Sequence, residues 1–236
     1  MMNNQTFADR AIAYTRQLNY TGNPLPPQII VMNPFVEGSE TMRVVAEFYT
    51  KYYNDNQPRH IILGINPGRF GGALTGIPVT DPKRLVSELG IAYNGKPAHE
   101  PSSVFVYEMI KAYGGAEAFY DDFYINSICP LGFAIVDEKG KPKNYNFYDS
   151  RELQNAVYDY MVKNVLKQID LGVNTDLCFC FGTGKNMEFL SKFNAKHGFF
   201  KKIIYLEHPR FIMQYKYKTR ELYIDKYLEA FSQINS

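Results

Sequence analysis

The chain has 236 residues, 45% of them hydrophobic, and a formal net charge of +2. This length and apolar content suit one α/β domain with a sizeable core, so we predict a single domain over residues 1–236. So small a net charge does not identify a nucleic-acid partner. Residues 1–19 lack a signal-peptide pattern and no apolar run is long enough to span a bilayer. We therefore expect a cytoplasmic protein without a membrane partner.

Strand and helix patterns alternate along the chain. In chain order they predict a helix at 41–54, a strand at 60–65, helices at 81–89 and 103–113, a strand at 123–128, a helix at 150–169, a strand at 177–181, a helix at 185–193 and a strand at 202–206. Residues 137–146 are polar, contain Gly140 and Pro142, and predict an exposed loop. The alternation indicates a three-layer α/β/α sandwich around a central, mainly parallel four-stranded sheet.

The cysteine and histidine positions argue against a metal centre. The cysteines are odd in number, and Cys178 and Cys180 alternate along a strand pattern, which favours buried free thiols. The histidines at 60, 99, 197 and 208 form no cluster at metal-ligand spacing. We expect no metal and no cofactor.

One C-terminal segment mixes basic and aromatic residues, a combination that suits phosphates and bases. Its members are Lys201, Lys202, Tyr205, Arg210, Phe211, Tyr215, Lys216, Tyr217, Lys218 and Arg220. An ordinary helix with packed tyrosines and solvated lysines explains the same pattern equally well.

Three segments follow predicted strands, at the sheet edge where parallel folds bind ligands. In the first, glycines cluster after Asn66 and allow a ligand to approach the backbone closely. In the second, Asn126 lies near the end of a buried strand, where its amide both donates and accepts hydrogen bonds. In the third, His208 follows the last strand and precedes Pro209. Each segment alone also fits a structural turn or cap.

Together these segments resemble the uracil-DNA glycosylase superfamily, most closely its single-strand-selective monofunctional branch and the bacterial relatives of that branch. The resemblance covers residues 64–210 and lies in three motifs in the family's order. They are Gly64-Ile65-Asn66-Pro67-Gly68 with Thr75-Gly76-Ile77-Pro78, then Asn126 with Cys129-Pro130-Leu131, then His208-Pro209.

The resemblance implies roles for individual residues. Asn66 would orient the attacking water, Asn126 would bind the base edge, and His208 would donate a hydrogen bond to the leaving base. The loop from Ile65 through Gly68 to Gly71 would contribute backbone amides. DNA contacts are expected from Gly182, Lys185, Pro209, Arg210 and Phe211, with Arg210 or Phe211 as the wedge that fills the space of a flipped base.

Two positions depart from the family pattern. Val79 stands where the branch commonly has a phenylalanine that stacks on the base, so we consider Phe70 as its replacement. Arg210 directly follows Pro209 where a serine and a second proline are common. These departures favour a shift in base preference from uracil towards hydroxymethyluracil, xanthine or hypoxanthine.

We therefore predict a monomeric, monofunctional DNA glycosylase that flips a uracil or a related deaminated or oxidised base and hydrolyses its N-glycosidic bond. No lysine matches a Schiff-base position, which excludes the bifunctional chemistry. One alternative is a catalytically weak nucleic-acid-binding module that recognises a flipped base without removing it. Another is an unrelated α/β hydrolase or small-molecule binder.

Overall fold

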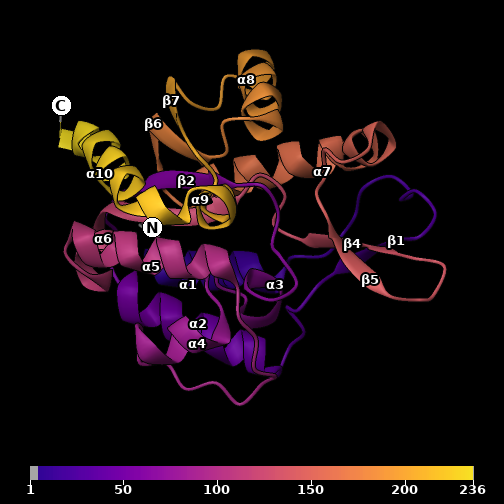
Figure 1. The fold of residues 1–236 in the computed structure, drawn as a ribbon, viewed down its shortest axis with the longest axis horizontal. Helices are drawn as coiled ribbons and strands as arrows, with labels where there is room; N and C mark the ends of the chain where they lie inside the picture. Colours follow the sequence, from indigo (N-terminus) through magenta and orange to yellow (C-terminus); the bar gives the residue numbers. More distant parts are fainter. Residues whose placement is uncertain (1–4, 236) are drawn as a thin grey trace.

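Four parallel strands form the central sheet of the protein in a computed structural model that describes residues 5–235 (Figure 1). They are β2 (His60–Gly64), β3 (Phe123–Ser127), β6 (Asn174–Phe181) and β7 (Lys202–Leu206), in the order β3-β2-β6-β7. All three pairings are parallel. The predicted sheet is confirmed, although β6 begins three residues before the predicted strand because its first residues are polar or exposed.

Helices connect and cover these strands. They are α1 (Phe7–Arg16), α2 (Glu40–Tyr52), α3 (Gly72–Thr75), α4 (Pro82–Ser87), α5 (Pro101–Tyr113), α6 (Ala116–Asp122), α7 (Arg151–Ile169), α8 (Lys185–His197), α9 (Pro209–Tyr215) and α10 (Arg220–Phe231). Five of them match the predicted helices, with ends shifted by a few residues. The prediction missed α1, although Thr6 and Asp9 form a capping box at its start.

Neighbouring residues of β3 show that helices cover both faces of the sheet. Phe123 packs against Phe231 of α10, with ring centroids 4.6 Å apart, whereas Tyr124 packs against Phe7 of α1 at 5.2 Å. Adjacent side chains of a strand point to opposite faces, so α10 and α1 lie on opposite sides. This is the three-layer arrangement predicted from the sequence.

A second, antiparallel sheet lies beside the first (Figure 1). It consists of β1 (Ile29–Met32), β4 (Gly132–Val136) and β5 (Pro142–Tyr145), in the order β1-β4-β5. The prediction of an exposed loop over residues 137–146 is therefore wrong for β5, a polar edge strand that pairs with β4. Proline and polar residues are typical of edge strands, which is why the sequence pattern pointed to a loop.

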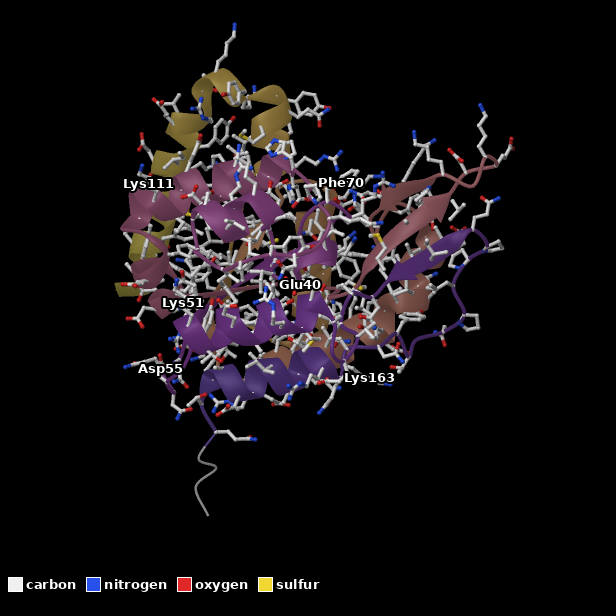
Figure 2. All side chains as sticks on the ribbon, turned by 90° about the horizontal axis from the view of Figure 1, so that it is seen from below. Glu40, Lys51, Asp55, Phe70, Lys111 and Lys163 are labelled. Atoms are coloured by element: carbon white, nitrogen blue, oxygen red, sulfur yellow. The ribbon has the colours of Figure 1, made fainter. Side chains whose placement is uncertain are left out.

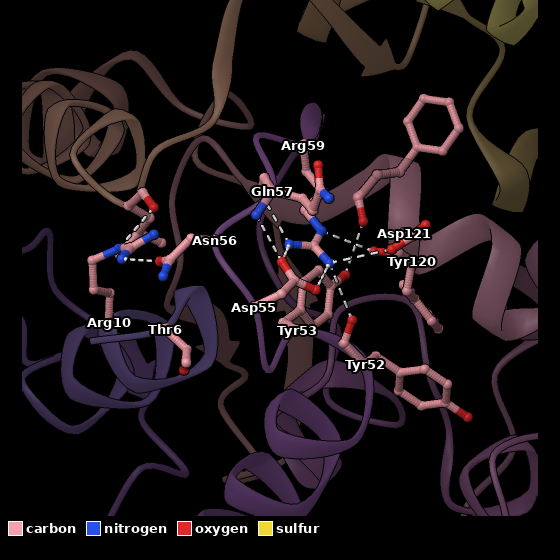
Figure 3. A network of polar contacts seen from close by, with 12 residues as sticks. Thr6, Arg10, Tyr52, Tyr53, Asp55, Asn56, Gln57, Arg59, Tyr120 and Asp121 are labelled. Carbon is pink, nitrogen blue, oxygen red and sulfur yellow. Dashed lines mark hydrogen bonds and ion pairs between the residues drawn. The ribbon is translucent and has the colours of Figure 1, made fainter. Parts of the chain in front are cut away.

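The amino-terminal edge of the central sheet is closed by Arg59, which is fully buried directly before β2 (Figure 3). Its guanidinium binds both carboxylate oxygens of Asp55 and donates to the carbonyls of Tyr52, Gln57 and Tyr120. Burying a charge is costly unless every donor has a partner, and this network supplies partners.

Three further features bear on expectations from the sequence: the cysteines, metal-binding groups and membrane-spanning helices. Cys129, Cys178 and Cys180 are free and buried, as predicted. Within residues 5–235, no group of three or more His, Cys, Asp or Glu side chains is placed to hold a metal ion. In the same range no helix is long and apolar enough to cross a membrane.

Candidate active site

Two connected cavities open at the carboxyl-terminal edge of the central sheet. The outer cleft measures about 450 Å³ and the inner pocket about 60 Å³. Both are lined by Ile65, Asn66, Pro67, Gly68, Glu100, Ser102 and His208. The inner pocket also reaches Val79 and Asn126, while the outer cleft reaches Gly182 and Lys185. The cavities thus bring together residues at the carboxyl ends of all four parallel strands.

Asn66 is held by the small sheet. Its Nδ2 donates to the carbonyl of Tyr145 at 3.3 Å, and its Oδ1 accepts from the backbone N–H of Phe147 at 3.1 Å. An sp² oxygen has a second lone pair, so Oδ1 retains acceptor capacity for a water. Because β5 ends at Tyr145, the strand that the sequence prediction missed is the element that fixes the orientation of Asn66.

Asn126 is buried near the end of β3, where its side chain borders the inner pocket. Its Nδ2 donates to the Tyr124 hydroxyl, and its Oδ1 accepts from the backbone N–H of Ser127 at 2.8 Å. The amide keeps one N–H and one lone pair beyond these bonds. A donor and an acceptor side by side match the imide edge of a pyrimidine.

His208 is half-buried between β7 and α9 and serves as the N-cap of that helix. Its Nδ1 accepts from the backbone N–H of Arg210 at 3.1 Å. Burial, aided by the charge of Arg210, lowers the pKa of His208 to about 4. The ring is therefore neutral at pH 7, and with Nδ1 as acceptor the proton is on Nε2. A neutral donor is thus available at the two cavities.

The Thr-Gly-x-Pro segment forms a rigid wall of the inner pocket. Thr75 Oγ1 donates to the carbonyl of Thr80 at 2.8 Å and accepts from the Ile77 N–H at 3.1 Å. Gly76 adopts a left-handed conformation with φ +76°, and Val79 does so with φ +50°. For a β-branched residue this conformation is strained. The strained backbone lies directly at the pocket, because Val79 lines it.

Glu100, directly before α5, is a site residue that the sequence analysis did not identify. Its side chain borders both cavities and packs against the glycine loop, where a Cβ on Gly68 would lie 2.6 Å from Oε1 and a Cβ on Gly71 only 1.9 Å from Oε2. Burial, together with the charge of Asp81, raises the pKa of Glu100 to about 7, although Arg210 acts in the opposite direction. The carboxyl is thus partly protonated at neutral pH.

The remaining predicted site residues are divided between the cavities and their surroundings. Arg210 and Phe211 line the outer cleft from the exposed side of α9. Pro209 is buried as the first residue of α9, and Gly71 supports Glu100 without lining either cavity.

Phe70 lies outside both cavities. It is 46% exposed (Figure 2), and the Arg69 guanidinium lies 4.5 Å from its ring centroid. It lines a neighbouring cavity that it shares with Glu100 and Arg210.

Several lining residues were not among the site residues predicted from the sequence. They are Asn144, Asn146, Tyr148, Asn186, Gln214 and Tyr215. In the basic and aromatic C-terminal segment, Phe211 and Tyr215 line the outer cleft, with their rings 5.4 Å apart. Pro209 is the first residue of α9, and proline is common at the first position of a helix. This signal could have predicted the helix that carries Phe211 and Tyr215.

The fold and these groups define a class of protein: an α/β enzyme whose pocket, at the carboxyl ends of parallel strands, offers fixed amides, a neutral imidazole and a protonatable carboxyl. The family model of the uracil DNA glycosylase superfamily matches residues 50–232. The crystal structure of wild-type SMUG2 from Pedobacter heparinus is 60% identical to the chain, with a TM-score of 0.95. The match covers 100% of this chain and 99% of that one. A search of curated proteins found no match.

The chain therefore belongs to the uracil DNA glycosylase superfamily, in its SMUG-like branch. It is a DNA glycosylase, a hydrolase whose substrate is DNA, as the motifs at Asn66, Asn126 and His208 indicated.

Proposed function

We propose that the protein is a monofunctional glycosylase that removes uracil or a related deaminated or oxidised base from DNA, acting as a monomer on a nucleotide flipped out of the strand. The observation that carries the proposal is that His208, whose Nδ1 accepts from the Arg210 N–H, lines the same inner pocket as Asn66 and Asn126. A neutral Nε2–H stabilises negative charge on a leaving base, and its own protonation state does not change when it does so.

The proposed reaction begins with cleavage of the bond between the sugar C1′ and the base nitrogen. The bonding electron pair leaves with the base, and the sugar gains oxocarbenium character. His208 donates to the base oxygen on which charge develops, and Asn126 pairs with the base edge. Water then adds to C1′ and releases a proton to the base or to solvent, since the amide of Asn66 orients the water without accepting that proton.

The entrance to the inner pocket supports base flipping. The inner pocket opens into the outer cleft, where Arg210 and Phe211 are exposed on α9 next to His208. We assign one of these two side chains as the wedge that fills the vacated position in the strand. Gly182 and Lys185, at the start of α8, are suited to a phosphate of the same strand because the first N–H groups of a helix are free to bind anions.

An excision assay tests the proposal. Labelled oligonucleotides carrying uracil, hydroxymethyluracil, xanthine or hypoxanthine, single-stranded and paired, are incubated with the protein and treated with alkali, which breaks the strand at abasic sites. We expect breaks at one or more of these bases with wild-type protein, and at least 10²-fold slower cleavage with Asn66→Ala at similar DNA affinity. Binding of all oligonucleotides without any break would instead favour a module that recognises a base without excising it.

A further inference from the structure

A second groove opens next to the outer cleft, between α7 and α8. It measures about 490 Å³ and shares Tyr148 and Lys185 with the outer cleft. Its lining residues are Tyr148, Gln154, Asn155, Tyr158, Lys185, Glu188, Phe189, Lys192, Phe193 and Lys196. The two cavities therefore adjoin each other at Tyr148 and Lys185.

Three exposed lysines give the groove a positive charge. Lys185, Lys192 and Lys196 are exposed on α8, and Glu188 is the one carboxylate among the lining residues. Across the described residues 5–235, none of these three lysines forms an ion pair with a carboxylate. The Lys196 ammonium lies 5.0 Å from the centroid of the Tyr158 ring, and no contact of this kind involves Lys185 or Lys192 within residues 5–235. Ammonium groups without a carboxylate partner along one side of a groove favour a polyanionic ligand.

Aromatic rings line the same groove between the lysines. Tyr148, Tyr158 and Phe189 are half-buried and thus keep part of their rings accessible. The Tyr158 hydroxyl is hydrogen-bonded to His197 Nε2 at 2.9 Å, and the ring of Phe189 stacks on that of Phe193 at 5.1 Å. These two rings are therefore held in place. Because the Lys196 ammonium lies 5.0 Å from the Tyr158 ring centroid, we assign base stacking to Tyr148 and Phe189.

We propose that the α7–α8 groove binds the single-stranded DNA that flanks the flipped nucleotide on one side. This inference rests on the proposed function, because it extends the path of the same strand. The lysines bind successive phosphates, and the rings stack on unpaired bases. The segment of α8 from Lys185 to Lys196 rises about 16 Å at ~1.5 Å per residue, so its lysines can contact more than one phosphate of an extended strand.

Single-stranded DNA fits the groove better than duplex DNA does. Rings that line a narrow groove bind the flat faces of bases, and those faces are accessible only when the bases are unpaired and unstacked from their partners. A duplex presents base edges and two phosphate backbones, for which lysines alone would be enough. The combination of rings and lysines therefore indicates a single strand.

The test measures affinity for undamaged single-stranded oligonucleotides, so it does not depend on excision. A long oligonucleotide has flanks on both sides of the central nucleotide, and two short ones lack either the 5′ or the 3′ flank. We expect wild-type protein to bind the long form and one short form more tightly than the other short form. With Lys192→Ala/Lys196→Ala this difference should disappear, and the slope of log K against log salt for the long form should fall by about 1.4, ~0.7 for each lost phosphate contact.

The matched control is Lys163→Ala/Lys167→Ala, which removes the same charge from exposed positions of α7 outside the groove lining. It should keep the flank dependence and most of the slope. Equal slope losses in both double variants would overturn the proposal, since net charge alone would then explain them. An equal loss for fully paired duplex would also overturn it in favour of duplex binding. If wild-type protein binds none of these undamaged oligonucleotides, the groove proposal fails, whereas the proposed function fails only if the excision assay yields no breaks.

Discussion

At the amino-terminal edge of the central sheet, Arg59 is fully buried and its guanidinium is bonded to a carboxylate and three carbonyls. At the carboxyl-terminal edge, Asn66, Asn126 and His208 each make hydrogen bonds to the backbone, and within residues 5–235 each keeps a donor or an acceptor without a protein partner. At the amino-terminal edge, the hydrogen-bonding groups of Arg59 are all paired within the fold and stabilise it. At the carboxyl-terminal edge, the backbone hydrogen bonds fix the orientation of the three side chains, and their remaining donors and acceptors are available to a ligand.

This contrast predicts that changes at the two edges affect different properties. Substitutions at the amino-terminal edge should lower the free energy of unfolding and leave the chemistry intact, whereas substitutions at the carboxyl-terminal edge should slow excision and leave stability nearly unchanged.

The largest expected effect is on stability. Arg59→Met removes the buried guanidinium and leaves the carbonyls of Tyr52, Gln57 and Tyr120 without a donor, so we expect the free energy of unfolding to fall by about 3–5 kcal/mol in urea titrations. Excision per folded molecule should stay at the wild-type rate at low temperature.

Arg16→Met is the control for this experiment. Arg16 pairs with Glu37 at 3.5 Å on the surface, with 54% of its side chain exposed, and should contribute ~0–1 kcal/mol. If both variants lost a similar free energy of unfolding, the buried network of Arg59 would contribute no more to stability than a surface ion pair.

The next largest effect is on the chemical step. His208→Ala removes one donor to the leaving base and should lower kcat by about 10²–10³-fold, or ~2.7–4 kcal/mol of barrier, in single-turnover excision. DNA affinity and melting temperature should change much less, because His208 contributes only one capping bond to the fold. A loss confined to affinity would remove His208 from the chemistry.

The same contrast explains which features were predictable from the sequence. The four parallel strands were predictable because each is a short apolar run whose pattern reflects its own burial. Asn66, Asn126 and His208 were predictable because they lie at or just beyond the carboxyl ends of those strands, at the edge where ligands bind. The resemblance to the glycosylase superfamily then assigned them roles.

Glu100 and β5 were not predictable in the same way. Glu100 is 34 residues beyond Asn66 in the chain and reaches the site only because α5 begins there, a tertiary arrangement that no local pattern encodes. The polar strand β5 resembles a loop because its pairing with β4, and not apolar burial, makes it a strand. Phe70 illustrates the opposite case: its sequence position is suitable, but its side chain lies outside both cavities.

The pH dependence of the excision rate tests the role of Glu100 at the carboxyl-terminal edge. Since its pKa is raised to about 7, the carboxyl is largely neutral below pH 7 and becomes ionised above it. An ionised carboxylate in the pocket repels the negative charge that develops on the leaving base, so we expect wild-type excision to slow by about tenfold as the pH rises from 6 to 8, a barrier change of ~1.4 kcal/mol.

Glu100→Gln stays neutral at every pH and should flatten this profile. Stability offers a second measurement. Between the ordinary carboxyl pKa of 4.5 and about 7, folded wild-type protein holds a proton that the unfolded chain releases, so its stability should decline as the pH rises through this range. Glu100→Gln should lack that decline. Identical profiles for both proteins would exclude titration of Glu100 at the site.

The smallest effect is expected at Val79, where the backbone is strained at φ +50° and the side chain lines the inner pocket. Val79→Gly relieves the strain but loses packing and gains flexibility in the unfolded chain, so we expect the free energy of unfolding to change by less than about 1 kcal/mol. The enlarged pocket should narrow the ratio of excision rates between the preferred base and the others. A variant with unchanged stability and weaker base selection would show that strain here serves recognition, in contrast to Arg59, where every bond serves the fold. If the variant instead lost stability and kept its base selection, Val79 would serve the stability of the fold, as Arg59 does.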